Sequence, residues 1–167
     1  MQSEIETPQD TNKSINFSLK SINLEKPIVM GILNITPDSF FDGGQNITDE
    51  AIVRKVNAME YDGAQIIDVG GYSTRPGAVE ISIEEELNRV LPIVKLIRSN
   101  FPDLAISIDT FRSEVAEQCI KAGATIVNDI SGGSLDPKMF DCVAQLKVPY
   151  ILMHIKGTPQ NMQESPT

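Results

Sequence analysis

Two kinds of hydrophobic pattern alternate along this chain from Pro27 onward. Short runs that are apolar at nearly every position are separated by longer stretches in which apolar residues recur every three or four positions. The short runs predict strands buried on both faces, as in a parallel sheet, and the longer stretches predict amphipathic helices. The expected strands are residues 28–33, 65–69, 105–108, 125–127 and 150–153.

The four longer stretches carry signals for helix ends. Side chains that accept hydrogen bonds from free backbone N–H groups precede each apolar pattern, and glycines follow the first and the third. The expected start signals are Thr48, the pair Ser82 and Glu85, Ser113, and Asp136 with Pro137, and the expected stop signals are Gly63 and Gly123. Pro92 lies inside the second pattern, where it is expected to kink the helix or split it in two.

The first residues of the chain differ from the rest. Residues 1–14 are polar, with little apolar surface to bury, and predict a disordered lead. Apolar and polar residues then alternate over residues 15–19 and again over residues 22–24, which suggests a short antiparallel hairpin. Residues 15–167 are therefore expected to form one α/β domain.

The expected order of elements leaves two architectures open. Either a doubly wound sheet or a (β/α)₈ barrel can begin with strands and helices in strict alternation. A dinucleotide-binding doubly wound sheet would place a G-x-G-x-x-G turn after its first strand. The sequence Asn34-Ile35-Thr36-Pro37 stands there instead, which favours a (β/α)₈ barrel. Such a barrel needs about 250 residues, so the chain is expected to hold only its strands 1–5 and helices 1–4.

Composition and charge narrow the classes of protein that fit. The chain is 41% hydrophobic and 22% charged, as soluble globular proteins are, and no apolar run reaches the roughly 18 residues of a membrane span. The polar start is neither a signal peptide nor a transit peptide, and Cys119 and Cys142 predict buried free thiols, which fits the cytoplasm. The net charge of −9 without a basic run argues against a nucleic-acid partner. The single histidine, His154, excludes a metal site built from several histidines.

Polar residues cluster where each expected strand ends. Asn34, the loop 70–77, Asp109 with Thr110, Asn128 with Asp129, and His154 follow the five strands in order, whereas the opposite connections are short and plain. Barrel enzymes keep their active sites at the carboxyl ends of the strands. This asymmetry predicts an enzyme or a ligand-binding protein.

Each of these residues also has a purely structural interpretation. Asp109 or Thr110 could cap the third helix, and Asn128 and Asp129 could satisfy backbone groups at a strand end. Asp68 is expected to be buried and to anchor a neighbouring loop through hydrogen bonds. His154 is assigned to structure first, and Met153 is either a core residue or the floor of a pocket for a planar ligand.

Five segments resemble the motifs of the dihydropteroate synthase family. They are Met30–Phe40 followed by Asp42-Gly43-Gly44, then Asp68–Ala78, Ser107–Thr110, Val127–Ile130, and Leu152-Met153-His154 with Lys156–Pro159. The segments occur in the family's order with the spacing of a barrel, and the resemblance covers roughly residues 15–163. Two positions depart from it, because Phe41 stands where serine is common and Tyr72 where glutamate is common.

The resemblance implies a pterin-binding barrel that takes part in folate synthesis. Its reaction joins p-aminobenzoate to 6-hydroxymethyl-7,8-dihydropterin diphosphate and releases pyrophosphate. The departing pyrophosphate gathers negative charge, which Mg²⁺ stabilises. The resemblance gives Asn34 a catalytic role at the metal and the diphosphate, and it places Thr74, Arg75 and Pro76 in the loop that grips diphosphate and p-aminobenzoate. Arg75 and Asp109 are also expected to be catalytic.

The remaining site residues follow from the same resemblance. Asp109 and Asn128 would hydrogen-bond the pterin, whose edge of donors and acceptors suits a carboxylate and an amide. Two apolar side chains, Ile130 and Met153, would pack against the pterin ring. The residues that would close the p-aminobenzoate pocket, the family's sulfonamide target, are Pro37, Ser39 and Phe40. No nucleophilic side chain is needed, because the arylamine attacks the pterin methylene carbon directly.

The family's later strands supply further site residues that this chain does not contain. The chain is therefore expected to be a portion of a longer protein, inactive when alone and a homodimer at full length. Two alternatives stay open: a methyltetrahydrofolate-dependent methyltransferase on the same type of barrel, and a non-catalytic half-barrel that binds a ligand or a complementary chain.

Overall fold

The computed structural model describes residues 14–17, 20–35, 48–73 and 79–157. Two short strands come first, β1 (Ser14–Phe17) and β2 (Lys20–Asn23), and they pair in antiparallel fashion with Ile15 opposite Ile22. The predicted hairpin is therefore confirmed.

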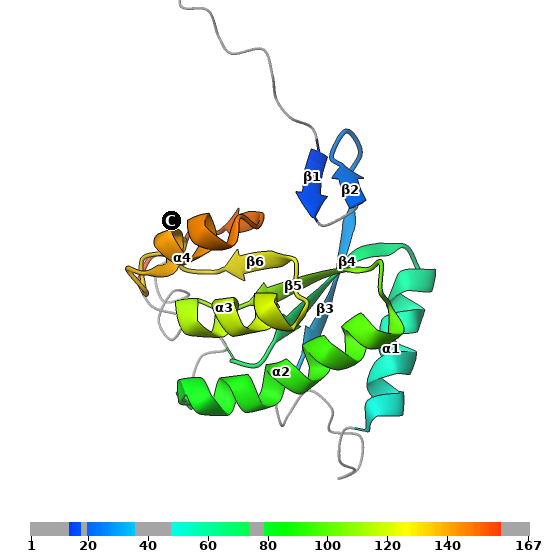
Figure 1. Cartoon of the computed structure of the whole chain (residues 1–167), viewed down its shortest axis with the longest axis horizontal. Coiled ribbons are helices and arrows are strands. Elements are labelled where there is room, and N and C mark those ends of the chain that lie inside the picture. The colour runs from blue at the N-terminus through cyan, green and yellow to red at the C-terminus, as the bar shows by residue number, and fades with distance from the viewer. Residues whose placement is uncertain (1–13, 18–19, 36–47, 74–78, 158–167) are drawn as a thin grey trace, which may run out of the picture.

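Five parallel strands form the main sheet, in the order in which they occur along the chain (Figure 1). They are β3 (Val29–Asn34), β4 (Ala64–Gly70), β5 (Ala105–Asp109), β6 (Ile126–Asp129) and β7 (Tyr150–Leu152). All five expected strands are present. Four of them end one or two residues later than expected, at Asn34, Gly70, Asp109 and Asp129, so these polar or small residues complete strands instead of starting loops.

The four expected helices are also present. They are α1 (Asp49–Tyr61), α2 (Ile83–Asn100), α3 (Ser113–Ala122) and α4 (Met139–Leu146). Thr48 and Ser82 cap the first two, since their hydroxyls accept hydrogen bonds from the backbone N–H groups of Ala51 and Glu85. Gly123 ends α3 with a φ of 118°, a left-handed conformation that favours glycine. Within the described residues, no helix combines the length and the apolar character that a membrane span requires.

Three helix-end predictions need correction. Pro92 does not split α2, which runs without a break for 18 residues because core side chains on both sides of the proline hold it against the sheet. The N-cap of α3 is Arg112, whose side chain makes no capping bond. The expected start signal Ser113 is the first residue inside the helix, and neither Asp109 nor Thr110 is its N-cap. Asp136 does not cap α4 either, because the helix begins at Met139 and Asp136 stands one turn before it.

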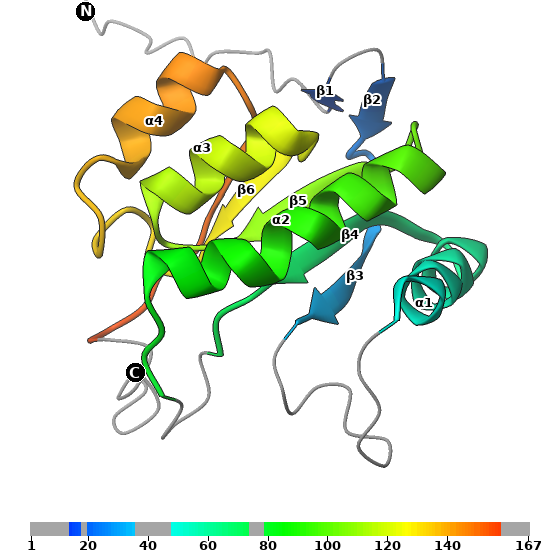
Figure 2. The same cartoon turned by 60° about the horizontal axis from the view of Figure 1, so that its bottom comes forward.

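The two faces of the sheet are covered differently. All four helices lie on one face (Figure 2), where they enclose the main core with strand residues such as Leu33, Ile67 and Ile106. On the other face, near the amino ends of the strands, a smaller cluster brings Ile22 of the hairpin against Ile66 and Ile126. Sequential strand order with helices on a single face is the arrangement of a barrel, because doubly wound sheets carry helices on both faces.

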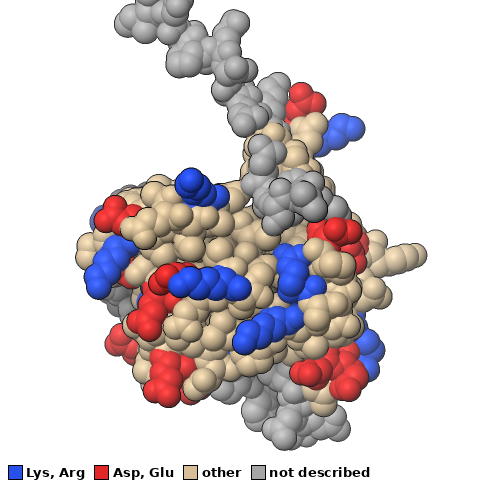
Figure 3. Space-filling model, in the orientation of Figure 1, with Lys and Arg blue, Asp and Glu red and all other residues tan. Residues whose placement is uncertain are grey.

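The burial of the two thiols and the distribution of surface charge can be compared with the predictions. Cys119 is fully buried and burial raises the pKa of its thiol to about 12, whereas Cys142 is only half-buried. On the face shown in Figure 3, the blue Lys and Arg side chains are interspersed with red Asp and Glu side chains instead of gathering in one basic patch.

Candidate active site

Three of the predicted site residues stand side by side at the carboxyl end of the sheet. The strand register pairs Asn34 with Gly70, Gly70 with Asp109, and Asp109 with Asn128. Residues paired across neighbouring parallel strands point to the same face of the sheet. These four residues, Asn34, Gly70, Asp109 and Asn128, form a polar row that spans four strands. Its two ends, Asn34 and Asn128, are 94 residues apart in the chain.

Gly70 makes room in the middle of this row. A Cβ atom at Gly70 would lie 3.1 Å from Oδ1 of Asn34 and 3.3 Å from Oδ2 of Asp109. The polar ends of both side chains, one from each neighbouring strand, thus lie close to Gly70. The missing side chain leaves the amide of Asn34 and the carboxylate of Asp109 close to each other and open toward a ligand.

A second polar layer lies one step deeper, toward the amino ends of the strands. Asp68 pairs with Ser107 across β4 and β5, and both residues are buried. Nδ2 of Asn128 donates a 3.0 Å hydrogen bond to Oδ2 of Asp68, which ties this layer to the row above it. The expectation that Asp68 is buried and hydrogen-bonded is confirmed, but its partner is a strand side chain and not a loop.

Several buried polar atoms in these layers lack a partner among the described residues. They are Oδ1 of Asp68, Oγ of Ser107 and Oδ1 of Asn128. An unpaired buried polar atom costs free energy of about 1–3 kcal/mol. Because all three belong to one cluster, a bound molecule with its own donors and acceptors would remove several of these costs together.

The electrostatics of the site are dominated by carboxyl groups. Burial raises the pKa of Asp109 to about 7, and the negative charges of Asp68, Glu86 and Asp129 add to the effect. Burial also raises the pKa of Asp68, against the opposing effect of its polar neighbours Ser107 and Asn128. Glu86 is paired with Arg112, whereas Asp68 and Asp109 have no cation in direct contact among the described side chains. The site therefore favours a ligand that supplies N–H donors or positive charge.

Asp129 has a different role from its neighbour Asn128. Its carboxylate accepts hydrogen bonds from the backbone N–H groups of Ser131 and Gly133, and from the hydroxyls of Ser131 and Tyr150. These bonds hold the loop between β6 and α4 in place. The prediction that this strand end satisfies backbone groups is therefore confirmed for Asp129. The side chain of Asn128 donates to Asp68 instead.

The structure adds two charged residues that the sequence patterns did not single out. Glu86 on α2 is fully buried, and it accepts hydrogen bonds from Oγ1 of Thr110 at 2.7 Å and from the Arg112 guanidinium at 2.8 Å. Glu86 occupies the apolar stripe of its helix, four residues before the buried Val90. That position in the helical repeat was the signal that could have identified it.

The other predicted site residues fall into two groups. Ile130 is half-buried and Met153 is 42% exposed, and they follow β6 and β7 at the same end of the sheet. Six predicted residues lie outside the described residues: Pro37, Ser39, Phe40, Thr74, Arg75 and Pro76. Their roles remain predictions.

Few side chains of the candidate active site could bind a divalent cation. No group of three or more acidic, histidine or cysteine side chains that could hold a metal ion occurs in the described part of the chain. The amide oxygen of Asn34 faces the open space above Gly70 and can supply one oxygen ligand. Mg²⁺ keeps several waters and binds through substrate phosphates together with one or two protein oxygens. A single amide oxygen therefore fits a magnesium ion that arrives with a diphosphate.

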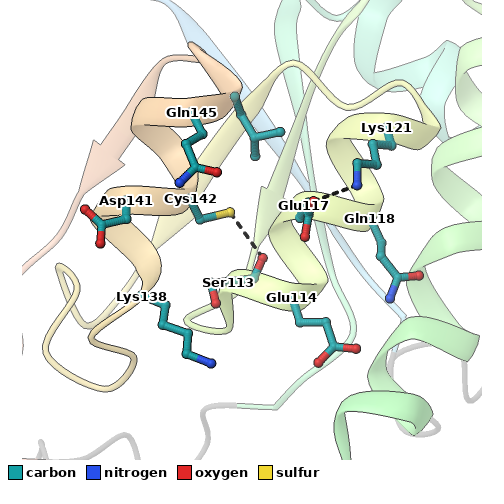
Figure 4. A pocket seen from close by; sticks show the side chains of 10 residues that line it. Ser113, Glu114, Glu117, Gln118, Lys121, Lys138, Asp141, Cys142 and Gln145 are labelled. Carbon is teal, nitrogen blue, oxygen red and sulfur yellow. Dashed lines mark hydrogen bonds and ion pairs between the residues drawn. The ribbon is translucent and has the colours of Figure 1, made fainter.

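A separate hollow of about 970 Å³ lies between α3 and α4 (Figure 4). Charged side chains such as Glu117, Lys121 and Asp141 line it, and the thiol of Cys142 donates a 3.4 Å hydrogen bond to the carbonyl oxygen of Ser113 at its floor. None of the predicted site residues lines this hollow. The polar row on the sheet remains the candidate active site.

Comparison with known proteins connects this row to a family. The model of the pterin binding enzyme family matches residues 30–167. The chain is 56% identical over 151 residues to the folic acid synthesis protein fol1 of Pneumocystis carinii, which covers 90% of this chain and 20% of that protein. It is 49% identical over 146 residues to the dihydropteroate synthase of Escherichia coli strain K12, which covers 87% of this chain and 51% of that protein.

Solved structures agree with these relatives. The dihydropteroate synthase of Yersinia pestis, in complex with a sulfonamide drug, superposes with a TM-score of 0.82 at 41% identity over 92% of this chain and 55% of that chain. The enzyme of Xanthomonas albilineans in complex with 7,8-dihydropteroate gives 0.74 at 35% identity over 86% of this chain and 51% of that chain. The expected partial barrel is confirmed, and the chain spans about half the length of these bacterial proteins.

Proposed function

The chain belongs to the family of pterin binding enzymes, and we propose that it serves the synthesis of 7,8-dihydropteroate. The substrates would be p-aminobenzoate and 6-hydroxymethyl-7,8-dihydropterin diphosphate, with pyrophosphate as the second product. Relatives described as dihydropteroate synthases support this choice. The activity belongs to a protein in which these strands are joined by the rest of a barrel.

One observation in the structure carries the proposal. Asp68, Ser107 and Asn128 each keep a buried polar atom without a partner among the described residues, and Asp109 stands beside them with a raised pKa. A pterin ring has N–H donors and ring acceptors along one edge. Carboxylates accept from such N–H groups, and an amide both donates and accepts. Bound there, the pterin edge would supply the missing partners.

The row would contribute to the reaction by orientation. The arylamine nitrogen of p-aminobenzoate forms a bond to the methylene carbon of the pterin, while the carbon–oxygen bond breaks and its electron pair leaves with pyrophosphate. The nitrogen then loses a proton. No side chain forms a covalent intermediate in this scheme, so Asp109 and Asn128 accelerate it by fixing the pterin for attack.

A magnesium ion would supply charge stabilisation for the leaving pyrophosphate. Asn34 would hold it with its amide oxygen, next to Gly70 and at the edge of the row. Thr74 and Arg75 would hold the diphosphate and p-aminobenzoate, Pro76 would line that loop, Ile130 and Met153 would contact the pterin, and Pro37, Ser39 and Phe40 would close the p-aminobenzoate pocket. The homodimer, the cytoplasmic location and the absence of nucleic-acid and membrane partners stay predictions from the sequence.

Ligand binding separates the proposal from the methyltransferase alternative. Calorimetric titration of the full-length protein carrying this chain should show tight binding of the pterin diphosphate and little binding of methyltetrahydrofolate. Asp109→Asn should weaken pterin binding at least tenfold, because one of the two carboxylate oxygens that could accept from the pterin N–H groups becomes an NH2 donor. The control Glu117→Gln, on the outer face of α3, should leave binding unchanged. Tighter binding of methyltetrahydrofolate than of the pterin diphosphate would refute the proposal.

A further inference from the structure

Asp109 and Thr110, where β5 ends, point to opposite faces of the sheet. Asp109 belongs to the polar row and Ser107 to the layer below it, so both side chains face the candidate active site. Side chains alternate along a strand, so Ile108 and Thr110 face the helices. Ile108 is accordingly part of the main core beneath the helices. Thr110 therefore lies behind the site, between the sheet and α2.

The hydroxyl of Thr110 joins the end of β5 to α2. It donates a 2.7 Å hydrogen bond to Oε1 of Glu86, and it accepts a 3.2 Å bond from the backbone N–H of Arg112. A hydroxyl that donates to a carboxylate makes a charge-assisted bond, which is roughly twice as strong as a neutral one. The backbone N–H of Thr110 also donates to the carbonyl oxygen of Asn128 at 3.0 Å. The residue after Asp109 is thus fixed to both a neighbouring strand and a helix.

Glu86 is itself held in a fixed position. Its side chain is 1% exposed, and its other oxygen, Oε2, accepts a 2.8 Å hydrogen bond from the Arg112 guanidinium. Arg112 also donates a 2.7 Å bond to the carbonyl oxygen of Ile81. Burial raises the pKa of Glu86, whereas the bond from Thr110 and the charge of Arg112 act in the opposite direction. Both carboxylate oxygens therefore have partners, and the group cannot turn without breaking one of these bonds.

The carboxyl group of Asp109 depends on the backbone for its position. Among the described residues, burial and the charges of neighbouring carboxyl groups act on it, and no hydrogen-bond donor does. Its place in the polar row is therefore set by the end of β5. The nearest side-chain anchor of that strand end, on the far side of the sheet from the row, is the bond from Thr110 to Glu86.

We propose that Glu86 is a positioning residue for Asp109: by holding Thr110 behind the sheet, it sets the place at which the Asp109 carboxyl meets a pterin. This inference rests on the proposed function, in which Asp109 accepts hydrogen bonds from the pterin edge. Glu86 lies on the helical side of the sheet and touches no substrate. Loss of its bond to Thr110 lets the end of β5 shift, which weakens pterin binding while the fold persists.

Two substitutions of Glu86 in the full-length protein separate its reach from its charge. Glu86→Asp keeps the charge beside Arg112, but the shorter side chain loses the bond to Thr110. Glu86→Gln loses the charge but keeps the length, with an amide that can accept from Arg112 and donate to Thr110. By calorimetry, the Kd of 6-hydroxymethylpterin, which lacks the diphosphate, should rise at least tenfold in Glu86→Asp and stay within threefold in Glu86→Gln. The opposite order would overturn the proposal, because charge and not position would then matter.

Thr110 offers a second pair of variants and a matched control. Thr110→Val removes the hydroxyl and should raise the same Kd at least tenfold, whereas Thr110→Ser keeps the hydroxyl and should stay within threefold of the wild type. If Thr110→Val does not fold, its combination with Glu86→Gln, which leaves no unpaired buried charge, takes its place.

Thr125→Val is the control for general destabilisation. The buried Thr125 hydroxyl also makes two hydrogen bonds, with the backbone N–H and the carbonyl oxygen of Ile106, but these lie near the amino end of β5. Thr125→Val should lower the urea midpoint of unfolding about as much as Thr110→Val and leave the Kd within twofold. Equal losses of affinity in the two valine variants would refute the positioning role.

Amide hydrogen exchange separates this inference from the proposed function. The N–H of Thr110, which is bonded to Asn128, should exchange at least tenfold faster in Glu86→Asp, relative to the N–H groups of β4. Its relative rate should stay unchanged in Thr125→Val. If the wild-type protein binds no 6-hydroxymethylpterin, the proposed function fails, while faster exchange still supports the anchoring of β5 by Glu86. An unchanged relative rate in Glu86→Asp would overturn the anchoring whatever the substrate.

Discussion

The most consequential single residue is Asp109, because three other carboxyl groups act on it. Its pKa is raised to about 7 by burial and by Asp68, Glu86 and Asp129. At neutral pH this carboxyl is therefore close to half protonated, whereas an ordinary aspartate is fully ionised. The site stores unfavourable electrostatic energy that a ligand with N–H donors can relieve.

This raised pKa predicts a pH dependence of stability. A carboxyl with a higher pKa in the folded state gives its full stabilising contribution below the unfolded value of 3.8, and this contribution is lost as the pH rises toward 7. Denaturant unfolding of both proteins between pH 4.5 and 8 measures this loss. The free energy of unfolding of the wild type should fall by roughly 2–4 kcal/mol relative to that of Asp109→Asn as the pH rises over this range. Parallel pH profiles of the two proteins would contradict the assignment.

Gly70 offers a second test at this scale. Gly70→Ala should displace Asn34 and Asp109, because the new Cβ atom lies 3.1 Å and 3.3 Å from their oxygens, and pterin affinity should fall at least tenfold. Gly31→Ala is the matched control: it crowds Met59 and Ile67 on the helical face of the sheet and touches no site residue. Overpacking costs about 1–3 kcal/mol in such positions. Equal losses of affinity in both variants would mean that Gly70 has no special place in the site.

Sequence reasoning located part of the site and missed the rest for a physical reason. Asn34, Asp109 and Asn128 were found because each stands at or next to the carboxyl end of a strand, and these ends meet at one edge of a parallel sheet. The pair Glu86 and Arg112 was not found, since their contact joins residues 26 positions apart and depends on how two helices pack. Only the place of Glu86 on an apolar stripe indicated that this carboxylate needs a buried partner.

At the scale of elements, Asp136 links two helices. Its carboxylate accepts a 2.7 Å hydrogen bond from the backbone N–H of Ser113, the first residue of α3, and a 2.9 Å bond from that of Lys138, just before α4. Burial alone would raise the pKa of this carboxyl, but the bonds from Ser113 and Lys138 lower it. The sequence predicted Asp136 as the N-cap of α4. Its shorter hydrogen bond instead satisfies a backbone N–H group at the start of α3, although Asp136 does not belong to that helix.

Asp136→Ala should therefore destabilise the protein by about 1–2 kcal/mol, the usual loss for an N-cap. Because the folded pKa is lowered, the contribution of Asp136 is present above its ordinary value and is lost as the pH falls through the folded value. Urea unfolding at pH 7 and at low pH measures both effects, and Asp136→Asn should lie between the wild type and the alanine variant. A destabilisation that persists at low pH would point to a cause other than these two bonds.

Element types were predictable along most of the described chain, and element ends were less so. Apolar runs specify strands, but the periodicity stops where polar residues begin, so Asn34, Gly70 and Asp109 were expected just outside the strands that they end. Pro92 weakens α2 locally, yet Val90, Ile93 and Val94 are buried around it, and their packing outweighs the lost backbone bond.

At the scale of the whole molecule, the five-stranded sheet corresponds to about half of the barrels that it resembles. The outer strands of the described sheet, β3 and β7, carry exposed apolar side chains: Val29, Ile32 and Leu152 are 57%, 56% and 60% exposed. Such surface is normally buried by further strands and helices. The polar row begins on the outer strand β3 and extends across the sheet to β6.

The measurement that tests the account most directly is the rate of 7,8-dihydropteroate formation from p-aminobenzoate and the pterin diphosphate with Mg²⁺. The full-length protein should form product, Asp109→Asn should reduce kcat/KM at least a hundredfold, and Glu117→Gln should match the wild type. The 167-residue chain alone should show no turnover. Absence of product from the full-length protein, or an Asp109→Asn variant as active as the wild type, would contradict the assignment of the polar row as the pterin site.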